Sequence, residues 1–148
     1  MEDRAPDVVW SGPLTILING NSASASEILA AAMQDYKRGV IIGTPSFGKG
    51  TVQSFFDMDQ MLLPQFDTIK PVGSVKITQQ KYYRINGGAT QIKGVTPDVL
   101  LPDPYEFLDR GEKELDNPMP WDEITKANYK EFNTINYANV VKKGSIRV

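Results

Sequence analysis

A strand–helix–strand pattern near the N-terminus constrains the fold more than any other part of the sequence. The stretch "PLTILIN" (13–19) is a short apolar run rich in β-branched residues, which is typical of a buried strand. From Ser24 to Tyr36 the apolar positions follow helical spacing, and a glycine soon afterwards marks the helix end. The stretch "VIIGT" (40–44) predicts a second buried strand. This order predicts a βαβ unit with two parallel strands, and therefore an α/β fold.

Further strands are expected downstream of this unit. The stretches "TVQSFFDM" (51–58) and "SVKITQQKYYRIN" (74–86) are rich in β-branched and aromatic residues and predict strands. The stretch 94–104 contains prolines that push their predecessors out of helical geometry, so we expect extended backbone there.

The composition changes after the first hundred residues. Residues 103–131 hold nine of the 18 acidic residues but only four of the 16 basic ones. We therefore expect residues 103–148 to form a solvated peripheral extension, with short helices around 105–109 and 124–132. The last residues, 140–148, support no interpretation from the sequence alone.

Overall composition bounds the class of protein. With 148 residues the chain has the size of one domain, and at 41% hydrophobic residues it has material for a core. Its net charge of −2 gives no reason to expect a nucleic-acid partner. The sequence has no apolar run long enough to cross a bilayer, and its opening residues do not resemble a secretory signal.

Two residue types are missing, and their absence restricts the chemistry. The chain has no cysteine, which excludes disulfides, thiolate catalysis and cysteine-bound zinc. It has no histidine, which excludes a Ser-His-Asp triad and histidine-ligated metals. A nucleophilic reaction would need another base, and lysine is the obvious candidate. We expect neither a metal nor a cofactor.

The stretch "NSASASEI" (21–28), where the predicted helix begins, has two interpretations. Ser24 and Glu27 have the spacing of a capping box, in which each side chain satisfies a backbone N–H of the other residue. A capping box does not explain the small residues from 22 to 26. A serine on a tight strand-to-helix turn is also exposed beside helix N–H groups that can stabilise an oxyanion. The two roles are compatible.

The loop "GTPSFGKGTVQ" (43–53) also has two interpretations. Gly43, Gly48 and Lys49 match a phosphate-binding loop as far as its lysine, but Gly50 stands where a magnesium-binding hydroxyl is needed. The following residues predict a strand, although a phosphate loop opens a helix. Nucleotide binding is therefore the weaker alternative.

Together these stretches resemble a known family. The segments "SASASEI…AAAMQDYKRGVIIGTPSFGKGTVQ", "QKYYRINGGATQIKGVTPDVLLP" and "GEKELDNPMPWDEI" are similar to the C-terminal processing peptidases, and more narrowly to the bacterial tail-specific proteases. The resemblance covers most of residues 13–124. It implies a serine endopeptidase that uses a lysine base and cleaves polypeptides near their C-termini.

The resemblance assigns roles to four residues. The middle serine of the motif, Ser24, corresponds to the nucleophile, and Lys49 of "FGKG" corresponds to the general base. Gln53 of "TVQ" corresponds to the glutamine beside the lysine. The backbone N–H of Ala25 corresponds to one oxyanion donor. A lysine acts as a base only when neutral, and burial lowers the pKa of a lysine toward the useful range.

The resemblance also implies an architecture and a setting. The fold would be a partial ClpP/crotonase-like α/β core, with residues 1–102 forming the C-terminal part of the catalytic domain. We expect the upstream part of that domain, with the second oxyanion donor, and a PDZ domain to lie outside this chain. The parent protein would act in the periplasm on polypeptides with nonpolar C-termini, and we expect this chain to self-associate and to be weakly active or inactive by itself.

Two further expectations come from the residues. Met58, Met61 and Leu62 could line a pocket for a nonpolar substrate residue. A noncatalytic fragment that only binds peptides remains an alternative to the peptidase.

Overall fold

A computed structural model describes residues 7–105, 107–132 and 135–147. Its first sheet has three strands in the order β1-β2-β5: β1 (Thr15–Ile18), β2 (Val40–Gly43) and β5 (Val99–Leu100). Both neighbouring pairs are parallel. Helix α1 (Ala25–Asp35) connects β1 to β2, which confirms the predicted βαβ unit. The fold is thus mixed α/β.

The core lies between this sheet and α1. Its buried residues are Ile18, Ala30, Ala31, Ile41 and Val95. Two adjacent alanines on α1 let the helix approach the strands closely, because their side chains end at Cβ. This packing fixes where the first turn of α1 lies relative to the ends of the strands.

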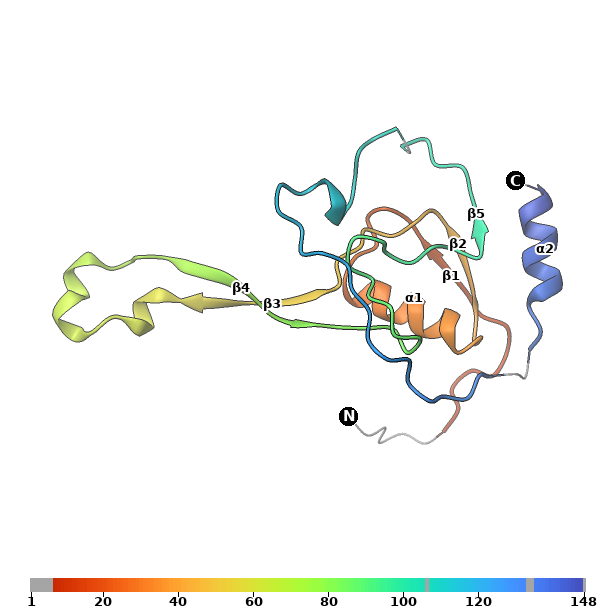
Figure 1. Ribbon diagram of the computed structural model, residues 1–148, viewed down its shortest axis with the longest axis horizontal. Coiled ribbons are helices and arrows are strands. Elements are labelled where there is room, and N and C mark those ends of the chain that lie inside the picture. Colours follow the sequence, from red (N-terminus) through yellow and green to blue (C-terminus); the bar gives the residue numbers. More distant parts are fainter. Residues whose placement is uncertain (1–6, 106, 133–134, 148) are drawn as a thin grey trace.

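The second sheet is a two-stranded antiparallel ribbon of β3 (Thr51–Asp57) and β4 (Ser74–Lys81). It projects from the body, and the 3-10 helices η1 (Met58–Met61) and η2 (Pro64–Ile69) lie at its far end (Figure 1). The strand predicted for 74–86 is shorter than expected. It ends at Lys81 because the chain then turns back toward α1.

The acidic region has little regular structure, and the two short helices predicted there are not found among the described residues. The stretch 105–109 is a turn, of which residue 106 lies outside the described residues, and 124–132 is irregular. The backbone of the second stretch is held by a distant loop instead: Ile124 N–H donates to Gly87 O and Ala127 N–H to Ile85 O. Those contacts replace the i to i−4 hydrogen bonds that a helix needs.

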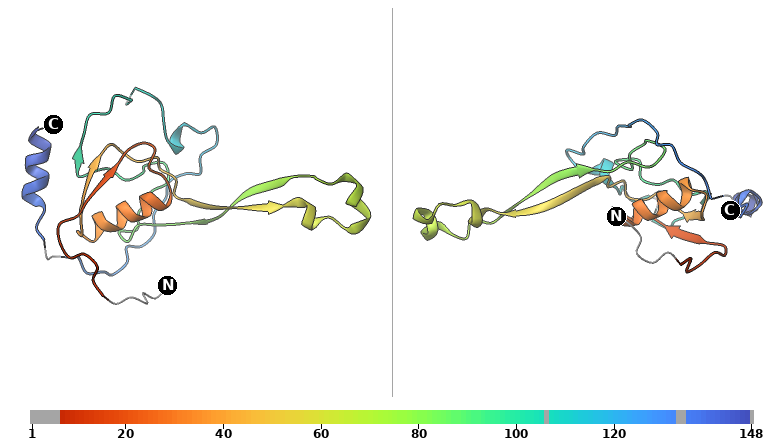
Figure 2. Two further views of the ribbon diagram at one scale, coloured as in Figure 1. Left: turned by 180° about the vertical axis from the view of Figure 1, so that it is seen from behind. Right: turned by 90° about the horizontal axis from the view of Figure 1, so that it is seen from below.

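The extension contains two helices that the sequence did not predict. The 3-10 helix η3 is Glu112–Glu114, and α2 is Ala138–Arg147 near the C-terminus. Helix α2 lies beside β5 (Figure 2). In the described ranges, no helix is both long and apolar enough to cross a membrane.

Candidate active site

Ser24 lies at a strained turn between β1 and α1. It is the N-cap of α1, and its backbone angles are φ 56° and ψ −113°. Residues other than glycine rarely adopt a positive φ, and such strain is concentrated at functional sites. A sharp strand-to-helix turn is also the geometry that presents a nucleophilic serine above a helix N-terminus. Next to it, the N–H of Ala25 donates to no acceptor within the described part of the chain.

Glu27 is the centre of the polar contacts around this turn. The capping box with Ser24 is present, with Ser24 N–H donating to Glu27 Oε2 at 2.8 Å. The same oxygen accepts the backbone N–H of Lys49 at 2.9 Å. The other oxygen, Oε1, accepts the Ser46 hydroxyl at 2.6 Å and the Gly48 N–H at 2.7 Å. The Glu27 side chain is fully buried, so one carboxylate joins the helix start to the 44–50 loop.

The sequence predicted only half of this role. The spacing of Ser24 and Glu27 indicated the cap, but nothing local indicated that Glu27 also binds the loop that carries Lys49. The available signal was the absence of acidic residues from 40 to 56, which leaves the N–H groups of that loop without a nearby carboxylate.

Lys49 is half-buried and lies just before β3. Its Nζ donates to the carbonyl oxygen of Thr51 at 3.0 Å. Among the described residues, no hydrogen bond joins Nζ to Ser24 Oγ, and no ion pair joins it to Glu27. The Glu27 carboxylate therefore binds the backbone N–H groups of both Ser24 and Lys49. The Lys49 amine instead donates to the carbonyl oxygen of Thr51.

Gln53 lies on β3, on the strand that follows the lysine loop. Its Nε2 donates to Thr78 Oγ1 on β4 at 3.2 Å. The ribbon has a register shift between Val52 and Gln53, and such bulges re-aim side chains near active sites. Its side-chain amide is thus held across the ribbon.

Tyr82 contacts both halves of the site. Its hydroxyl lies 3.1 Å from Ser24 O and 2.5 Å from Lys49 O. Burial raises the pKa of the Tyr82 hydroxyl to about 12, so it remains a protonated donor at neutral pH. Tyr82 lies in the family-like segment 80–102, but no sequence pattern assigned it a role at the site.

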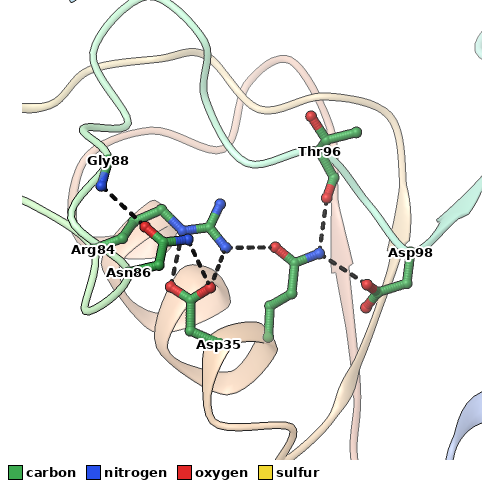
Figure 3. A network of polar contacts seen from close by, with 7 residues as sticks. Asp35, Arg84, Asn86, Gly88, Thr96 and Asp98 are labelled. Atoms are coloured by element: carbon green, nitrogen blue, oxygen red, sulfur yellow. Dashed lines mark hydrogen bonds and ion pairs between the residues drawn. The ribbon is translucent and has the colours of Figure 1, made fainter. Parts of the chain in front are cut away.

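A polar network holds the other end of α1 (Figure 3). Arg84 donates to both carboxylate oxygens of Asp35, at 2.6 and 2.9 Å, and also to Gln34 Oε1 at 2.8 Å. Gln34 in turn donates to Asp98 Oδ1 at 2.9 Å. Bidentate arginine–carboxylate pairs fix orientation strongly. The segment that carries Tyr82 is therefore bound to α1 at both ends of the helix.

Two other expectations can be placed in the structure. The loop that carries Lys49 continues into β3 and not into a helix, so the nucleotide-binding alternative lacks the helix N-terminus that it requires. Met58 and Met61 form part of η1, with Leu62 next to them, and η1 lies at the far end of the ribbon, away from α1 and its N-terminal turn (Figure 1). Within the described ranges, no cluster of three or more acidic side chains could hold a metal ion.

Comparison with known families decides the assignment. Residues 1–101 match the sequence profile of peptidase family S41. The chain belongs to peptidase family S41. Residues 105–148 match the profile of the C-terminal domain of tail-specific protease.

Curated relatives of this S41 chain agree with the assignment. It is 46% identical over 142 residues to the tail-specific protease of Haemophilus influenzae, covering 92% of the chain and 19% of that protein. It is 41% identical over 115 residues to the carboxy-terminal-processing protease of Bartonella bacilliformis, covering 74% of the chain and 24% of that protein. The S41 chain thus spans about a fifth to a quarter of the length of these relatives.

Two solved structures are similar to part of this chain. A photosystem II D1 C-terminal processing protease superposes with a TM-score of 0.50 at 37% identity, covering 62% of the S41 chain and 21% of that structure. Mature CPAF superposes with a TM-score of 0.54 at 24% identity, covering 66% and 17%, and this second likeness concerns the fold alone.

Proposed function

We propose that this chain carries the nucleophile and the general base of a serine endopeptidase. Ser24 is the nucleophile, and Lys49 is the base. The observation that carries the proposal is the position of Ser24 at a strained turn, with its N–H and that of Lys49 bound to one oxygen of Glu27. Such a shared anchor fixes the two backbones relative to each other, which is what a catalytic pair requires.

The reaction would proceed through an acyl-enzyme. The neutral Lys49 amine leaves the Thr51 carbonyl and takes the proton of Ser24 Oγ as that oxygen attacks the scissile carbonyl. The Ala25 N–H donates to the developing oxyanion, together with a second donor from outside this chain. Lys49 then gives its proton to the leaving amine, and water hydrolyses the ester. Gln53, which is neutral, would orient the amine without stabilising its charged form as a carboxylate would.

The names of the relatives suggest the substrate class. Both curated relatives are named for action at protein tails or carboxyl termini, so the proposed substrates are polypeptides cut near their C-termini. The preference for nonpolar C-termini is part of the proposal and rests on the family resemblance alone. We further propose a partial ClpP/crotonase-like catalytic core over residues 1–102, a peripheral extension over 103–148, and a periplasmic parent protein. The proposed reaction needs no cofactor.

A fluorophosphonate probe tests the proposal against a noncatalytic peptide-binding role. The probe should label the protein at Ser24, as located by peptide mass spectrometry. Ser22→Ala should leave the labelling unchanged, and Ser24→Ala should abolish it. Failure of the protein at its natural full length to react at Ser24 would refute the peptidase assignment and favour the peptide-binding alternative.

A further inference from the structure

The hydroxyl of Tyr82 lies between the main chains of the two proposed catalytic residues. It is 3.1 Å from Ser24 O and 2.5 Å from Lys49 O. We propose that Tyr82 is a positioning residue that, together with the first-turn hydrogen bonds of α1 and the Glu27 carboxylate, holds the Ser24–Ala25 peptide and the Lys49 loop in place relative to each other. This inference rests on the proposed peptidase function.

The planar peptide bond after Ser24 links its carbonyl to the Ala25 N–H. The Ser24 carbonyl and the Ala25 N–H belong to one peptide group, and in a trans peptide they point in opposite directions. Each donor that binds Ser24 O therefore also restrains the direction of the Ala25 N–H. Ser24 O accepts the N–H groups of Glu27 and Ile28 at 2.9 and 3.0 Å within the first turn of α1, and the Tyr82 hydroxyl adds a contact from outside the helix.

The second contact of the hydroxyl is with the lysine loop. The Lys49 carbonyl and the Gly50 N–H belong to one peptide group as well. The Gly50 N–H donates to Gln91 Oε1 at 2.8 Å, and the carbonyl faces the Tyr82 hydroxyl. The hydroxyl has one proton, which the shorter distance of 2.5 Å assigns mainly to Lys49 O, and the 3.1 Å contact with Ser24 O is the weaker of the two. Without the hydroxyl, the two peptides would lose their link through Tyr82 and would be joined through Glu27 alone.

Tyr82 is itself held rigidly. Its backbone N–H donates to Gly50 O at 3.1 Å. Two residues later, Arg84 pairs with Asp35 at the opposite end of α1 with a closest distance of 2.6 Å. Because Tyr82 is held through Gly50 on one side and through the Arg84–Asp35 pair on the other, its hydroxyl can fix the position of the peptides that it contacts.

The test compares Tyr82→Phe with Tyr83→Phe in the protein at its natural full length. Tyr83 is the matched control because its hydroxyl donates to the exposed Asp122 at 3.0 Å and touches neither proposed catalytic residue. Tyr82→Phe should lower kcat by about 10- to 100-fold, the cost of a misplaced or misdirected group, with KM within about twofold of wild type. Fluorophosphonate labelling of Ser24, normalised to the folded fraction from near-ultraviolet circular dichroism, should slow by a similar factor. Tyr83→Phe should match wild type.

A fluorinated tyrosine at position 82 serves as a second variant, because it keeps the ring and the hydroxyl but ionises at lower pH. It should match wild type where its hydroxyl is protonated and approach Tyr82→Phe where it is ionised. If wild type cleaves substrate and labels at Ser24 while Tyr82→Phe does so equally fast, the positioning role is wrong and the peptidase assignment stands. If wild type neither cleaves nor labels, both proposals fail together.

Discussion

Ser24 and Lys49 donate their backbone N–H groups to the same oxygen atom, Oε2 of Glu27, at 2.8 and 2.9 Å. One residue begins a helix and the other ends a loop before a strand. Because the shared acceptor is a fully buried carboxylate, a side chain in the core links the positions of the two residues.

The carboxylate of Glu27 should therefore be essential to stability. In Glu27→Gln, an NH2 group replaces one carboxylate oxygen and cannot accept the hydrogen bonds that this oxygen accepts in the wild type. The buried N–H groups that donate to it would therefore lose their acceptor. We expect a loss of about 3 kcal/mol in the free energy of unfolding, measured by urea denaturation. Glu114→Gln, at an exposed position, is the control and should stay within about 0.5 kcal/mol of wild type. Equal stability of the two variants would show that the four contacts of Glu27 are not what holds the loop.

The strain at Ser24 should be measurable independently of activity. Ser24→Gly should be more stable than Ser24→Ala by about 1 kcal/mol, because glycine adopts φ 56° without cost and alanine does not. At Ser26, an exposed position inside α1, the order should reverse, because alanine is favoured over glycine in a helix. Thermal or urea unfolding of the four variants provides the comparison. If the glycine and alanine variants ranked in the same order of stability at Ser24 and at Ser26, the backbone at Ser24 would not be strained.

The partly buried Tyr82 hydroxyl should make stability depend on alkaline pH. Burial, with smaller contributions from the Glu27 and Glu112 carboxylates, raises its pKa to about 12 from an ordinary value of 10.0. A raised pKa contributes stability that is fully present below about pH 10 and is lost as the pH rises through about 12. The difference in unfolding free energy between wild type and Tyr82→Phe should shrink over this interval. A constant difference from pH 9 to pH 12 would contradict this burial.

Replacing Lys49 by arginine separates a base from a fixed charge. Guanidinium keeps its proton at any workable pH, so Lys49→Arg retains the charge but cannot accept the proton of Ser24. We expect peptidase activity of the protein at its natural full length to be as low in Lys49→Arg as in Lys49→Ala. Lys130→Arg, at an exposed position, should be fully active. Retained activity in Lys49→Arg would mean that Lys49 serves as a positive charge and that the base is another group.

The sequence predicted those parts of the fold that depend on local pattern. The βαβ unit was predicted because β-branched runs flank a helix-periodic segment, and each signal is contained within a few residues. Helix α2 was missed because "ANVVKKGSIR" has β-branched residues and a glycine inside it, and its position beside β5 depends on tertiary contact. The helix predicted for 124–132 was wrong because long-range backbone contacts to Ile85 and Gly87 took the place of helical ones.

The candidate site likewise combines residues that a local motif indicates with residues that only tertiary contacts bring into place. Ser24, Lys49 and Gln53 were named as candidates from motifs, since each motif lies in one short stretch. Glu27 and Tyr82 join segments that are distant in the sequence, so their contacts with the Lys49 loop could not be inferred from spacing. Only the folded chain places a helix carboxylate and the residue after β4 against the same loop.

The central claim is that Ser24 and Lys49 act as one catalytic unit, and a double-mutant comparison tests it most directly. Initial rates of peptide cleavage by the protein at its natural full length should be compared for wild type, Ser24→Ala, Lys49→Ala and the double variant. Each single change should remove nearly all activity, and the double change should cost little more, because members of one catalytic unit are not additive. Losses that multiply, so that the double variant is slower by the product of the two single effects, would contradict the pair.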